Sequence, residues 1–292
     1  MIPVAFDYEA PATVADALKL LSRLGDRAKV VAGGHSLIPT MKLRLAQPEV
    51  LIDISRIAEL RGITTDGNHL VVGALATHAQ VASSDLVRRQ APLLAEVAGI
   101  IGDPQVRNRG TLGGSLAHAD PAADYPAAAL ALDVEVVARG PRSERTIPIT
   151  RFFRSLLTTA LRPNELIVAV RVPKAARGQG GAYVKLANKA SHYAVVGVAA
   201  SVQVTRGRIS AIAVGVTGAG STPRRAGRVE RALLGSPPDV AAIERASASA
   251  AEGLDLLSDI HGSAEYRAHI TRVYTRRAID AALGRTGVAR AA

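Results

Sequence analysis

The order of apolar and polar residues along the chain predicts its secondary structure. Near the N-terminus, apolar residues recur on one face at helical spacing, which predicts a helix over residues 13–24 that ends at a glycine. Short runs rich in β-branched residues follow, and they predict strands at residues 29–32, 50–54 and 70–73. The first part of the chain therefore mixes a helix with several short strands.

A longer apolar segment and a hairpin signal occupy the middle of the chain. Residues 81–98 are expected to be helical, in two pieces divided near Pro92. Two short strands, at residues 134–137 and 146–148, flank a Gly-Pro turn and predict a hairpin. A further strand is predicted at residues 166–172.

The last third of the chain carries strands first and helices afterwards. The short, basic, glycine-rich segment at residues 174–181 is the best candidate for a domain boundary. Beyond it, strands are predicted at residues 182–185, 194–204 and 209–217, and helices at residues 229–234, 240–251 and 264–283. This order favours an α+β fold over a doubly wound parallel sheet.

Composition limits the class of protein. Apolar residues make up 48% of the 292 residues, enough for a sizeable core. No apolar stretch reaches the roughly 18–20 residues that a membrane-spanning helix needs. The N-terminus lacks the basic region of a secretory signal, so we expect a cytoplasmic protein. Association with a membrane through partner subunits stays open.

Cysteine usage and charge exclude several chemistries. The chain contains no cysteine, which excludes disulfides, thiol nucleophiles and iron–sulfur clusters held by this chain. Its net charge of +11 is compatible with nucleic acid, but only 3% of its residues are aromatic and its basic residues are interleaved with acidic ones. We therefore expect no nucleic-acid partner, and a basic surface suits an acidic protein subunit equally well.

Candidate chemistry is concentrated in two glycine-rich segments. The first reads Ala32, Gly33, Gly34, His35 and Ser36, and the second reads Thr111, Leu112, Gly113, Gly114 and Ser115. Consecutive glycines let the backbone approach a ligand closely, and successive backbone N–H groups form a concave anion site. Ser36 is also expected to cap a helix over residues 37–45, whose first N–H groups would face the same point. Two such segments suit a pyrophosphate held from two sides.

The two glycine segments also have other interpretations. Both are also compatible with ordinary turns, in which glycine supplies unusual backbone angles. The chain has no phosphate-binding P-loop motif and no nucleophile elbow, and the GVTGAG run at residues 215–220 does not lead into a helix. His118, Asp120 and Asp124 have the spacing of a polar turn more often than of a metal site, so no metal ligand is assigned.

The two segments, together with several others, resemble one family. The chain is similar to the FAD-binding medium subunits of molybdenum hydroxylases, and most strongly to the carbon monoxide dehydrogenase members. The resemblance extends over nearly the whole chain, and the order and spacing of the two glycine segments make it highly specific. The matching segments are IPVAFDY, AGGHSLIPTMKLRLAQPE, DPQVRNRGTLGGSLAHADPAAD, YVKLANKASHYAVVGVAA and AEYRAHITRVYTRRAI.

The resemblance implies two domains and a set of cofactor contacts. Residues 1–176 would form a vanillyl-alcohol-oxidase-type (PCMH-type) FAD-binding domain, and residues 178–285 a smaller α+β domain with a three-stranded antiparallel sheet and helices. The ten residues of the two glycine segments would hold the pyrophosphate and ribityl groups of non-covalent FAD, with no covalent link to His35. In the family the second segment often ends in asparagine, and the serine at position 115 keeps a donor and an acceptor but lacks the reach of the amide.

Further residues receive roles from the same resemblance. Asp124 would accept a hydrogen bond from a ribityl or ribose hydroxyl. Lys185 would lie near the carbonyl edge of the flavin, and Tyr193 would stack on its ring. Apolar wall residues would be Leu37, Ile101 and Ile167. From the residues alone, Tyr193 is equally a half-buried strand residue, Lys185 a solvated lysine and Ile101 a core residue.

The resemblance also implies partners. A large subunit would carry the molybdenum cofactor and the substrate pocket, and a small subunit would carry [2Fe–2S] clusters, in a heterotrimer that pairs into a dimer. The external acceptor would be a compound such as a quinone. Carbon monoxide is the favoured substrate of the holoenzyme, with an aldehyde, purine or N-heterocycle as alternatives. A self-contained flavin oxidase and a non-catalytic nucleotide-binding subunit are the competing functions.

Overall fold

The computed structural model describes residues 1–287 of the chain. Its N-terminal lobe is a three-stranded parallel sheet of order β1-β3-β2 that packs against α1. The elements are β1 (Asp7–Glu9), α1 (Val14–Leu24), η1 (Gly25–Arg27), β2 (Ala28–Val31), α2 (Leu37–Lys42), β3 (Val50–Asp53) and η2 (Ala58–Leu60). The buried face of α1 has the predicted apolar spacing, and the Thr13 hydroxyl caps it by accepting from the Asp16 N–H at 3.1 Å.

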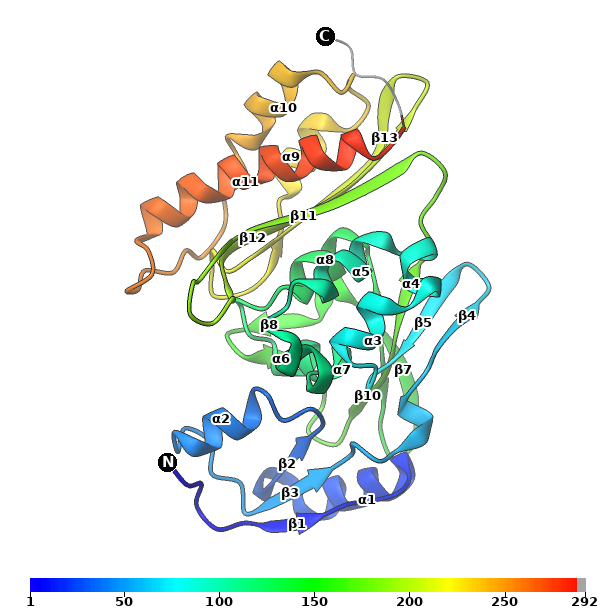
Figure 1. Cartoon of the computed structure of the whole chain (residues 1–292), viewed down its shortest axis with the longest axis vertical. Helices are drawn as coiled ribbons and strands as arrows, with labels where there is room; N and C mark the ends of the chain where they lie inside the picture. The colour runs from blue at the N-terminus through cyan, green and yellow to red at the C-terminus, as the bar shows by residue number, and fades with distance from the viewer. Residues whose placement is uncertain (288–292) are drawn as a thin grey trace.

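A five-stranded antiparallel sheet of order β4-β5-β10-β6-β7 forms the middle of the molecule (Figure 1). Its strands are β4 (Ile63–Asp66), β5 (His69–Gly73), β6 (Glu135–Arg139), β7 (Glu144–Pro148) and β10 (Leu166–Pro173). The predicted hairpin is confirmed as β6 and β7. Because β10 pairs with both β5 and β6, it joins segments that lie far apart in the sequence. Between β7 and β10 lie η3 (Ile149–Arg151) and a small hairpin of β8 (Phe153–Ser155) and β9 (Thr158–Thr159).

Six short helices lie around this sheet, and all of them except the one at Pro104–Arg109 contribute buried residues to its apolar core. They are α3 (His78–Ser83), α4 (Asp85–Gln90), α5 (Pro92–Gly99), α6 (Pro104–Arg109), α7 (Leu112–His118) and α8 (Tyr125–Ala131). The helical segment predicted at residues 81–98 has three pieces rather than two, since a second break falls at Ser84. The Ser84 hydroxyl caps α4 by accepting from the Val87 N–H at 3.4 Å.

The C-terminal part is an antiparallel sheet of order β11-β12-β13-β14 covered by helices. Its elements are β11 (Gln179–Ala187), β12 (Ala194–Thr205), β13 (Arg208–Thr217), β14 (Arg224–Arg225), α9 (Gly227–Leu233), α10 (Val240–Ser247) and α11 (Ala264–Gly284). The two-residue strand β14 adds a fourth strand to the three that were predicted. One face of the sheet packs on α11, and the other packs on α5 and α8, so the two halves share a buried boundary (Figure 1).

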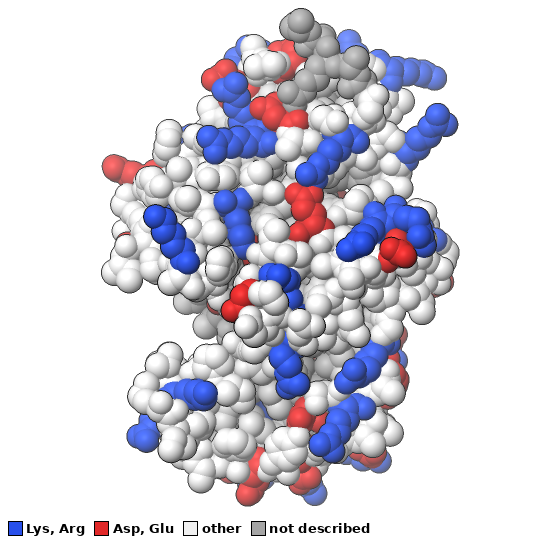
Figure 2. Space-filling view, in the orientation of Figure 1, with Lys and Arg blue, Asp and Glu red and all other residues white. Residues whose placement is uncertain are grey.

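Charged side chains are spread over the molecule. Figure 2 shows Lys and Arg scattered among Asp and Glu on one face, with a hollow on the side where α2 lies opposite the rest of the chain. Within the part of the chain that the structure describes, no helix has the length and apolar character needed to cross a membrane.

Candidate functional site

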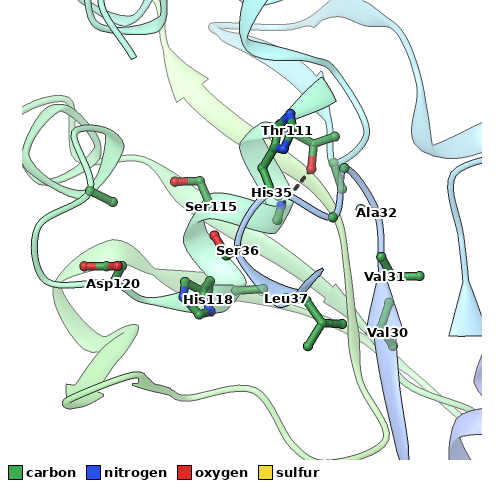
Figure 3. A pocket seen from close by; sticks show the side chains of 18 of the residues that line it. Val30, Val31, Ala32, His35, Ser36, Leu37, Thr111, Ser115, His118 and Asp120 are labelled. Atoms are coloured by element: carbon green, nitrogen blue, oxygen red, sulfur yellow. Dashed lines mark hydrogen bonds between the residues drawn. The ribbon is translucent and has the colours of Figure 1, made fainter. Parts of the chain in front are cut away.

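A cavity of about 510 Å³ lies between the N-terminal lobe and the rest of the molecule. Small-molecule sites typically have volumes of roughly 300–1,000 Å³. Its wall comes from β2 and the loop that follows it, from α7, from the turn before α8 and from the loop before β12. Figure 3 shows Ser36, Ser115, His118 and Asp120 at this cavity.

The first glycine segment supplies free backbone donors to the cavity. We call residues 33–36 the first loop. Among the described residues, the N–H groups of Gly33, Gly34, His35 and Ser36 make no hydrogen bond within the protein. Gly34 has a φ of +76°, the left-handed backbone that glycine adopts without strain. Successive unpaired N–H groups around such a residue are able to bind an anion.

Two details of this segment differ from the prediction. The Ser36 side chain makes no capping hydrogen bond, because its backbone is helical (φ −101°, ψ −50°) rather than extended as an N-cap requires. Its carbonyl oxygen instead accepts from the Thr40 hydroxyl at 2.7 Å. The helix that follows ends at Lys42, earlier than the predicted residue 45.

Gly33 is required by the packing of one loop on another. A Cβ atom on Gly33 would lie 2.1 Å from the carbonyl oxygen of Arg109, just before the second glycine segment. No side chain fits at such a separation, so glycine at this position lets the two backbones touch. The sequence analysis expected the two segments to lie close together because they would hold one pyrophosphate from two sides. The structure shows that their backbones also contact each other directly.

The second glycine segment begins a helix, which the sequence analysis did not predict. We call residues 111–115 the second loop. Thr111 is the N-cap of α7, and its hydroxyl oxygen accepts from the Gly114 N–H at 3.1 Å. The N–H groups of Leu112, Gly113 and Ser115 donate to the carbonyl oxygens of Ala76, Ala74 and Thr111 at 3.0, 2.9 and 3.0 Å. The expectation that this segment offers free backbone donors is therefore wrong, because the protein itself uses them.

What the second loop offers the cavity is side-chain chemistry. Thr111 and Ser115 both line it. The Thr111 oxygen already accepts one hydrogen bond, which leaves its proton free to donate, and the Ser115 hydroxyl has no partner among the described residues. His118 and Asp120 line the cavity too, but no group of three metal-ligating side chains occurs among the described residues.

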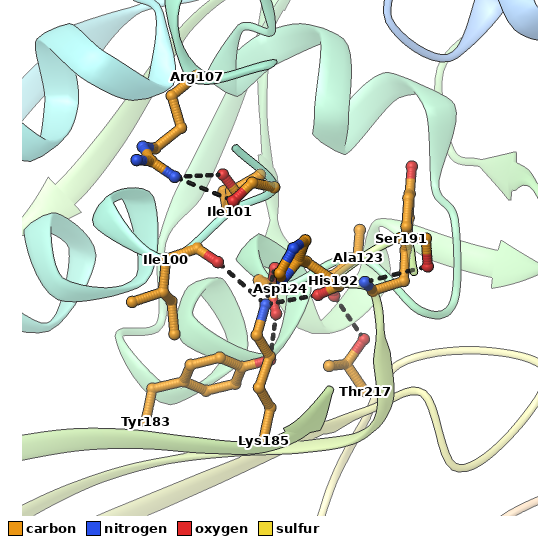
Figure 4. Close-up of polar contacts among 12 residues, drawn as sticks. Ile100, Ile101, Arg107, Ala123, Asp124, Tyr183, Lys185, Ser191, His192 and Thr217 are labelled. Carbon is orange, nitrogen blue, oxygen red and sulfur yellow. Dashed lines mark hydrogen bonds and ion pairs between the residues drawn. The ribbon is translucent and has the colours of Figure 1, made fainter. Parts of the chain in front are cut away.

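Asp124 is held by two donors from β11. Its carboxylate accepts from the Tyr183 hydroxyl at 2.6 Å and from the Lys185 ammonium at 3.0 Å (Figure 4). Burial raises the pKa of Asp124, and the positive charge of Lys185 and both hydrogen bonds oppose that rise. Asp124 lines the cavity, and each of its oxygens retains a lone pair for a ligand hydroxyl.

Lys185 and Leu112 do not line the cavity, unlike the other predicted residues. Lys185 donates to Asp124 and to the carbonyl oxygens of Ile100 and His192, at 3.1 and 2.8 Å for the two carbonyls, so its three N–H groups are occupied (Figure 4). To contact a ligand carbonyl, the Lys185 ammonium would have to give up one of these hydrogen bonds. Leu112 is 2% exposed and its side chain belongs to the main core. The cavity wall includes Leu37, Ile101, Ile167 and Tyr193.

Tyr193 precedes β12 and brings the C-terminal half to the cavity. Its side chain is 39% exposed. Burial and then the charge of Asp120 raise its pKa, while a polar contact with the Ser36 side chain opposes the rise and the charge of Asp124 adds to it. The phenol is thus neutral at physiological pH, and Tyr193 lines the cavity.

His78 is a cavity residue that the sequence analysis missed. It is 5% exposed, and its Nδ1 atom has no hydrogen-bond partner in the described chain. Burial, together with the charges of His35 and Arg107, lowers the pKa of His78 to about 4. Its ring packs edge-on against Tyr125, with centroids 5.2 Å apart, and its backbone N–H donates to the Gly110 carbonyl oxygen at 3.0 Å. No motif marks this residue in the sequence.

Part of the apolar wall was also missed. It comes from β2, from the segment before α3 and from the region of the β8–β9 hairpin. These residues lack a glycine motif, and only the fold brings them to the cavity. They include Val30, Val31, Ile54, Leu75, Leu157, Leu161 and Leu166.

The residues present fit a dinucleotide with a flat aromatic ring system. Free N–H groups and hydroxyls meet at the junction of the two loops, where a pyrophosphate would find donors. Apolar wall segments and Tyr193 suit ring faces. Covalent attachment is not required for such a ligand to be held, because the donors surround it from two sides.

Comparison with known families and proteins agrees with this geometry. Residues 4–175 match the FAD binding domain in molybdopterin dehydrogenase, and residues 181–282 match the CO dehydrogenase flavoprotein C-terminal domain. The carbon monoxide dehydrogenase medium chain of Hydrogenophaga pseudoflava is 42% identical over 285 residues, which are 98% of this chain and 99% of the relative.

Two further relatives are similar over the same length. The 6-hydroxypseudooxynicotine dehydrogenase complex subunit alpha of Paenarthrobacter nicotinovorans is 40% identical, over 98% of this chain and 97% of the relative. A solved structure of carbon monoxide dehydrogenase from Hydrogenophaga pseudoflava superposes with a TM-score of 0.95 at 44% identity, and covers 97% of this chain and 99% of that one.

Proposed function

The chain belongs to the FAD-binding medium subunits of molybdenum hydroxylases, and from this premise we propose that it carries electrons, through its FAD, from a partner subunit's [2Fe–2S] clusters to an external acceptor. The observation that carries this proposal is the cavity of about 510 Å³ at which residues from both matched domains meet. All predicted cofactor residues except Leu112 and Lys185 line that cavity.

The first and second loops would hold the cofactor in different ways. The four free N–H groups of the first loop would bind the pyrophosphate, and the Thr111 and Ser115 hydroxyls would donate from the opposite side. Asp124 would accept from a ribityl or ribose hydroxyl while Tyr183 and Lys185 fix its carboxylate in place. The domain boundary would fall near residue 177, between the two matched segments.

Bound FAD supplies the redox chemistry, so no side chain of this chain has to act as an acid or base on the substrate. Tyr193 would cover one face of the flavin ring, and the apolar wall would exclude water from the other parts of it. Lys185 would act through Asp124 rather than by direct contact with the flavin carbonyl, since its three N–H groups are already satisfied.

Partner subunits would supply the remaining centres. This chain has no cysteine to bind an iron–sulfur cluster. A small subunit with [2Fe–2S] clusters and a large subunit with the molybdenum cofactor would complete a heterotrimer, paired into a dimer. The basic surface favours acidic partner faces. A quinone as acceptor would place the complex on the cytoplasmic side of a membrane, held there by its partners.

Carbon monoxide is the substrate we propose for the holoenzyme, since a carbon monoxide dehydrogenase medium chain is 42% identical over nearly the full length. An N-heterocyclic or related substrate is the second candidate, because a subunit of 6-hydroxypseudooxynicotine dehydrogenase is 40% identical. The large subunit holds the substrate pocket, so activity assays on the co-expressed complex, with carbon monoxide and with pyridine compounds, separate the two.

An absorption spectrum of the chain, co-expressed with its partners and then separated from them, tests the proposal. We expect the two visible bands of oxidised flavin, FAD released on denaturation, and iron–sulfur absorbance only in the complex. Substrate oxidation by the isolated chain would favour a self-contained flavin oxidase. A folded, colourless chain that cannot be reconstituted with FAD would overturn the proposal.

A further inference from the structure

Arg267 of α11 is buried at the boundary between the C-terminal sheet and the cavity loops. Its side chain is 3% exposed. One terminal nitrogen donates to the carbonyl oxygens of Val195 and Gly218 at 2.6 and 2.7 Å. The other donates to both carboxylate oxygens of Asp259 at 2.7 and 2.8 Å, and the Nε–H reaches the Gly262 carbonyl oxygen at 3.4 Å.

The two carbonyl groups held by Arg267 belong to the strand ends that grip the cavity turn. Gly218 donates its N–H to the Pro121 carbonyl oxygen at 2.6 Å, and Ala194 donates to Ala122 at 3.1 Å. The Thr217 hydroxyl lies 2.6 and 2.7 Å from the carbonyl oxygens of Pro121 and Ala123. Figure 4 shows Thr217 meeting Ala123 beside Asp124. Three consecutive carbonyls of the turn before α8 are thus fixed by the C-terminal sheet.

A second route runs from Arg267 to the loop that carries Tyr193. Asp259, paired with Arg267, accepts from the His261 N–H at 2.8 Å. The His261 ring meets the Asn188 side-chain nitrogen at 3.2 Å. Asn188 in turn organises the loop, because its backbone N–H donates to the Tyr193 carbonyl oxygen at 2.8 Å and its side-chain oxygen accepts from the Ser191 N–H at 3.1 Å.

We infer that Arg267 is a positioning residue, which fixes Tyr193 and the turn that carries Asp124 at the cavity without touching the ligand. This inference rests on the proposed FAD site. Only a guanidinium presents five donors in a rigid fork, and all of its partners here need that spread. A lysine ammonium has three donors on one point, so Arg267→Lys keeps the charge but leaves several buried carbonyls unsatisfied.

The experiment compares FAD binding in the full chain and in a set of variants. Arg267→Lys is expected to raise the FAD dissociation constant about tenfold, equivalent to one lost charge-assisted hydrogen bond, and to change the visible circular dichroism of the bound flavin. Arg276→Lys is the matched control, since Arg276 lies on the same helix in an exposed ion pair with Glu244. Ile243→Ala, a core truncation in the same domain, controls for lost stability alone.

Thr217→Val provides an independent test if Arg267→Lys does not fold. It keeps the side-chain shape, removes the hydroxyl that holds the cavity turn, and is expected to change the flavin dichroism in the same direction. In a Tyr193→Ala background, Arg267→Lys is expected to raise the dissociation constant less than in the wild type.

Unchanged dichroism with a dissociation constant within twofold of wild type, in either Arg267→Lys or Thr217→Val, would overturn the inference. An equal loss of affinity in Ile243→Ala would also overturn it, because stability alone would then explain the effect. Failure of the wild-type chain to bind FAD would instead contradict the proposed function.

Discussion

The first and second glycine loops look alike in sequence but differ in how they use their glycines. In the first loop, residues 33–36, four backbone N–H groups have no partner among the described residues, and all four residues line the cavity. In the second, residues 111–115, the N–H groups of Leu112, Gly113, Gly114 and Ser115 donate within the protein, and Gly113 is required because a Cβ there would lie 2.6 Å from the Ala74 Cβ.

The difference shows that a glycine pair has two separate physical causes. One is a positive φ that turns successive N–H groups toward a ligand, as at Gly34. The other is close packing of backbone on backbone, as at Gly33 and Gly113. The sequence signal is the same in both cases. The second loop therefore contacts a ligand through its side chains rather than through its backbone.

Gly33→Ala should give the largest effect. The new Cβ would lie 2.1 Å from the Arg109 carbonyl oxygen, so the loops must separate and the N–H groups must turn. We expect the FAD dissociation constant to rise about 5- to 150-fold, from the roughly 1–3 kcal/mol typical of overpacking. Fluorescence titration of the full chain measures it. Gly284→Ala is the control, because nothing lies within 4 Å of that Cβ; similar losses in both variants would refute the loop-contact argument.

His78 beneath the second loop should make stability depend on pH. Its folded pKa of about 4 lies below the ordinary value of 6.5, so the native state favours the neutral ring. The stabilisation is complete above pH 6.5 and is lost as pH falls toward 4. Between pH 7 and pH 5 the free energy of unfolding should fall by about 2 kcal/mol more in the wild type than in His78→Gln. Urea unfolding at both pH values measures this difference, and equal pH dependence in the two proteins would contradict it.

Thr111→Ala should lower the stability of the protein, because Thr111 caps the helix at the second loop. Its hydroxyl oxygen caps α7 at 3.1 Å from the Gly114 nitrogen. Loss of an N-cap costs about 0.5–2 kcal/mol, so the free energy of unfolding should fall by that amount. Thr111→Ser keeps the hydroxyl and should restore most of it. If Thr111→Ala left the free energy of unfolding unchanged, the capping role would be wrong.

Ser115→Ala should give the smallest effect and refines the comparison. The Ser115 hydroxyl lines the cavity without a partner among the described residues. Its loss should weaken FAD binding about 2- to 10-fold, the value of one neutral hydrogen bond of 0.5–1.5 kcal/mol. Thermal stability should stay the same. Ser115→Asn keeps a donor and an acceptor with a longer reach and should retain or improve affinity; a loss equal to that of Ser115→Ala would show that this contact is not made.

Much of the fold follows from local patterns in the sequence. The helix at α1, the β6–β7 hairpin and the three long C-terminal strands each have a clear periodicity or turn signal, and the α+β class follows from their order. The helix α7 was missed because Gly113 and Gly114 disfavour a helix, and the N-cap at Thr111 and the packing on Ala74 outweigh that preference. The short strands β1 and β4 were missed because they have few buried residues.

The candidate site also contains residues that the sequence predicts and residues that it does not. Residues within the two glycine segments were found because the motif is contiguous, and most of them line the cavity. His78 and the wall at Leu157 and Leu161 were not found, because only tertiary folding brings them there. Arg267 contacts groups 72 and 49 residues away in the sequence, and no local pattern reports such a contact.

Backbone amide NMR of the full 30.3 kDa chain during FAD titration tests the central claim most directly. We expect large shifts for the amide groups of Gly33, Gly34, His35 and Ser36, because they gain a phosphate acceptor. Small shifts are expected for Leu112, Gly113 and Gly114, whose hydrogen bonds stay within the protein. Equal shifts in both loops, or larger shifts in the second, would contradict the assignment of the pyrophosphate to the first loop.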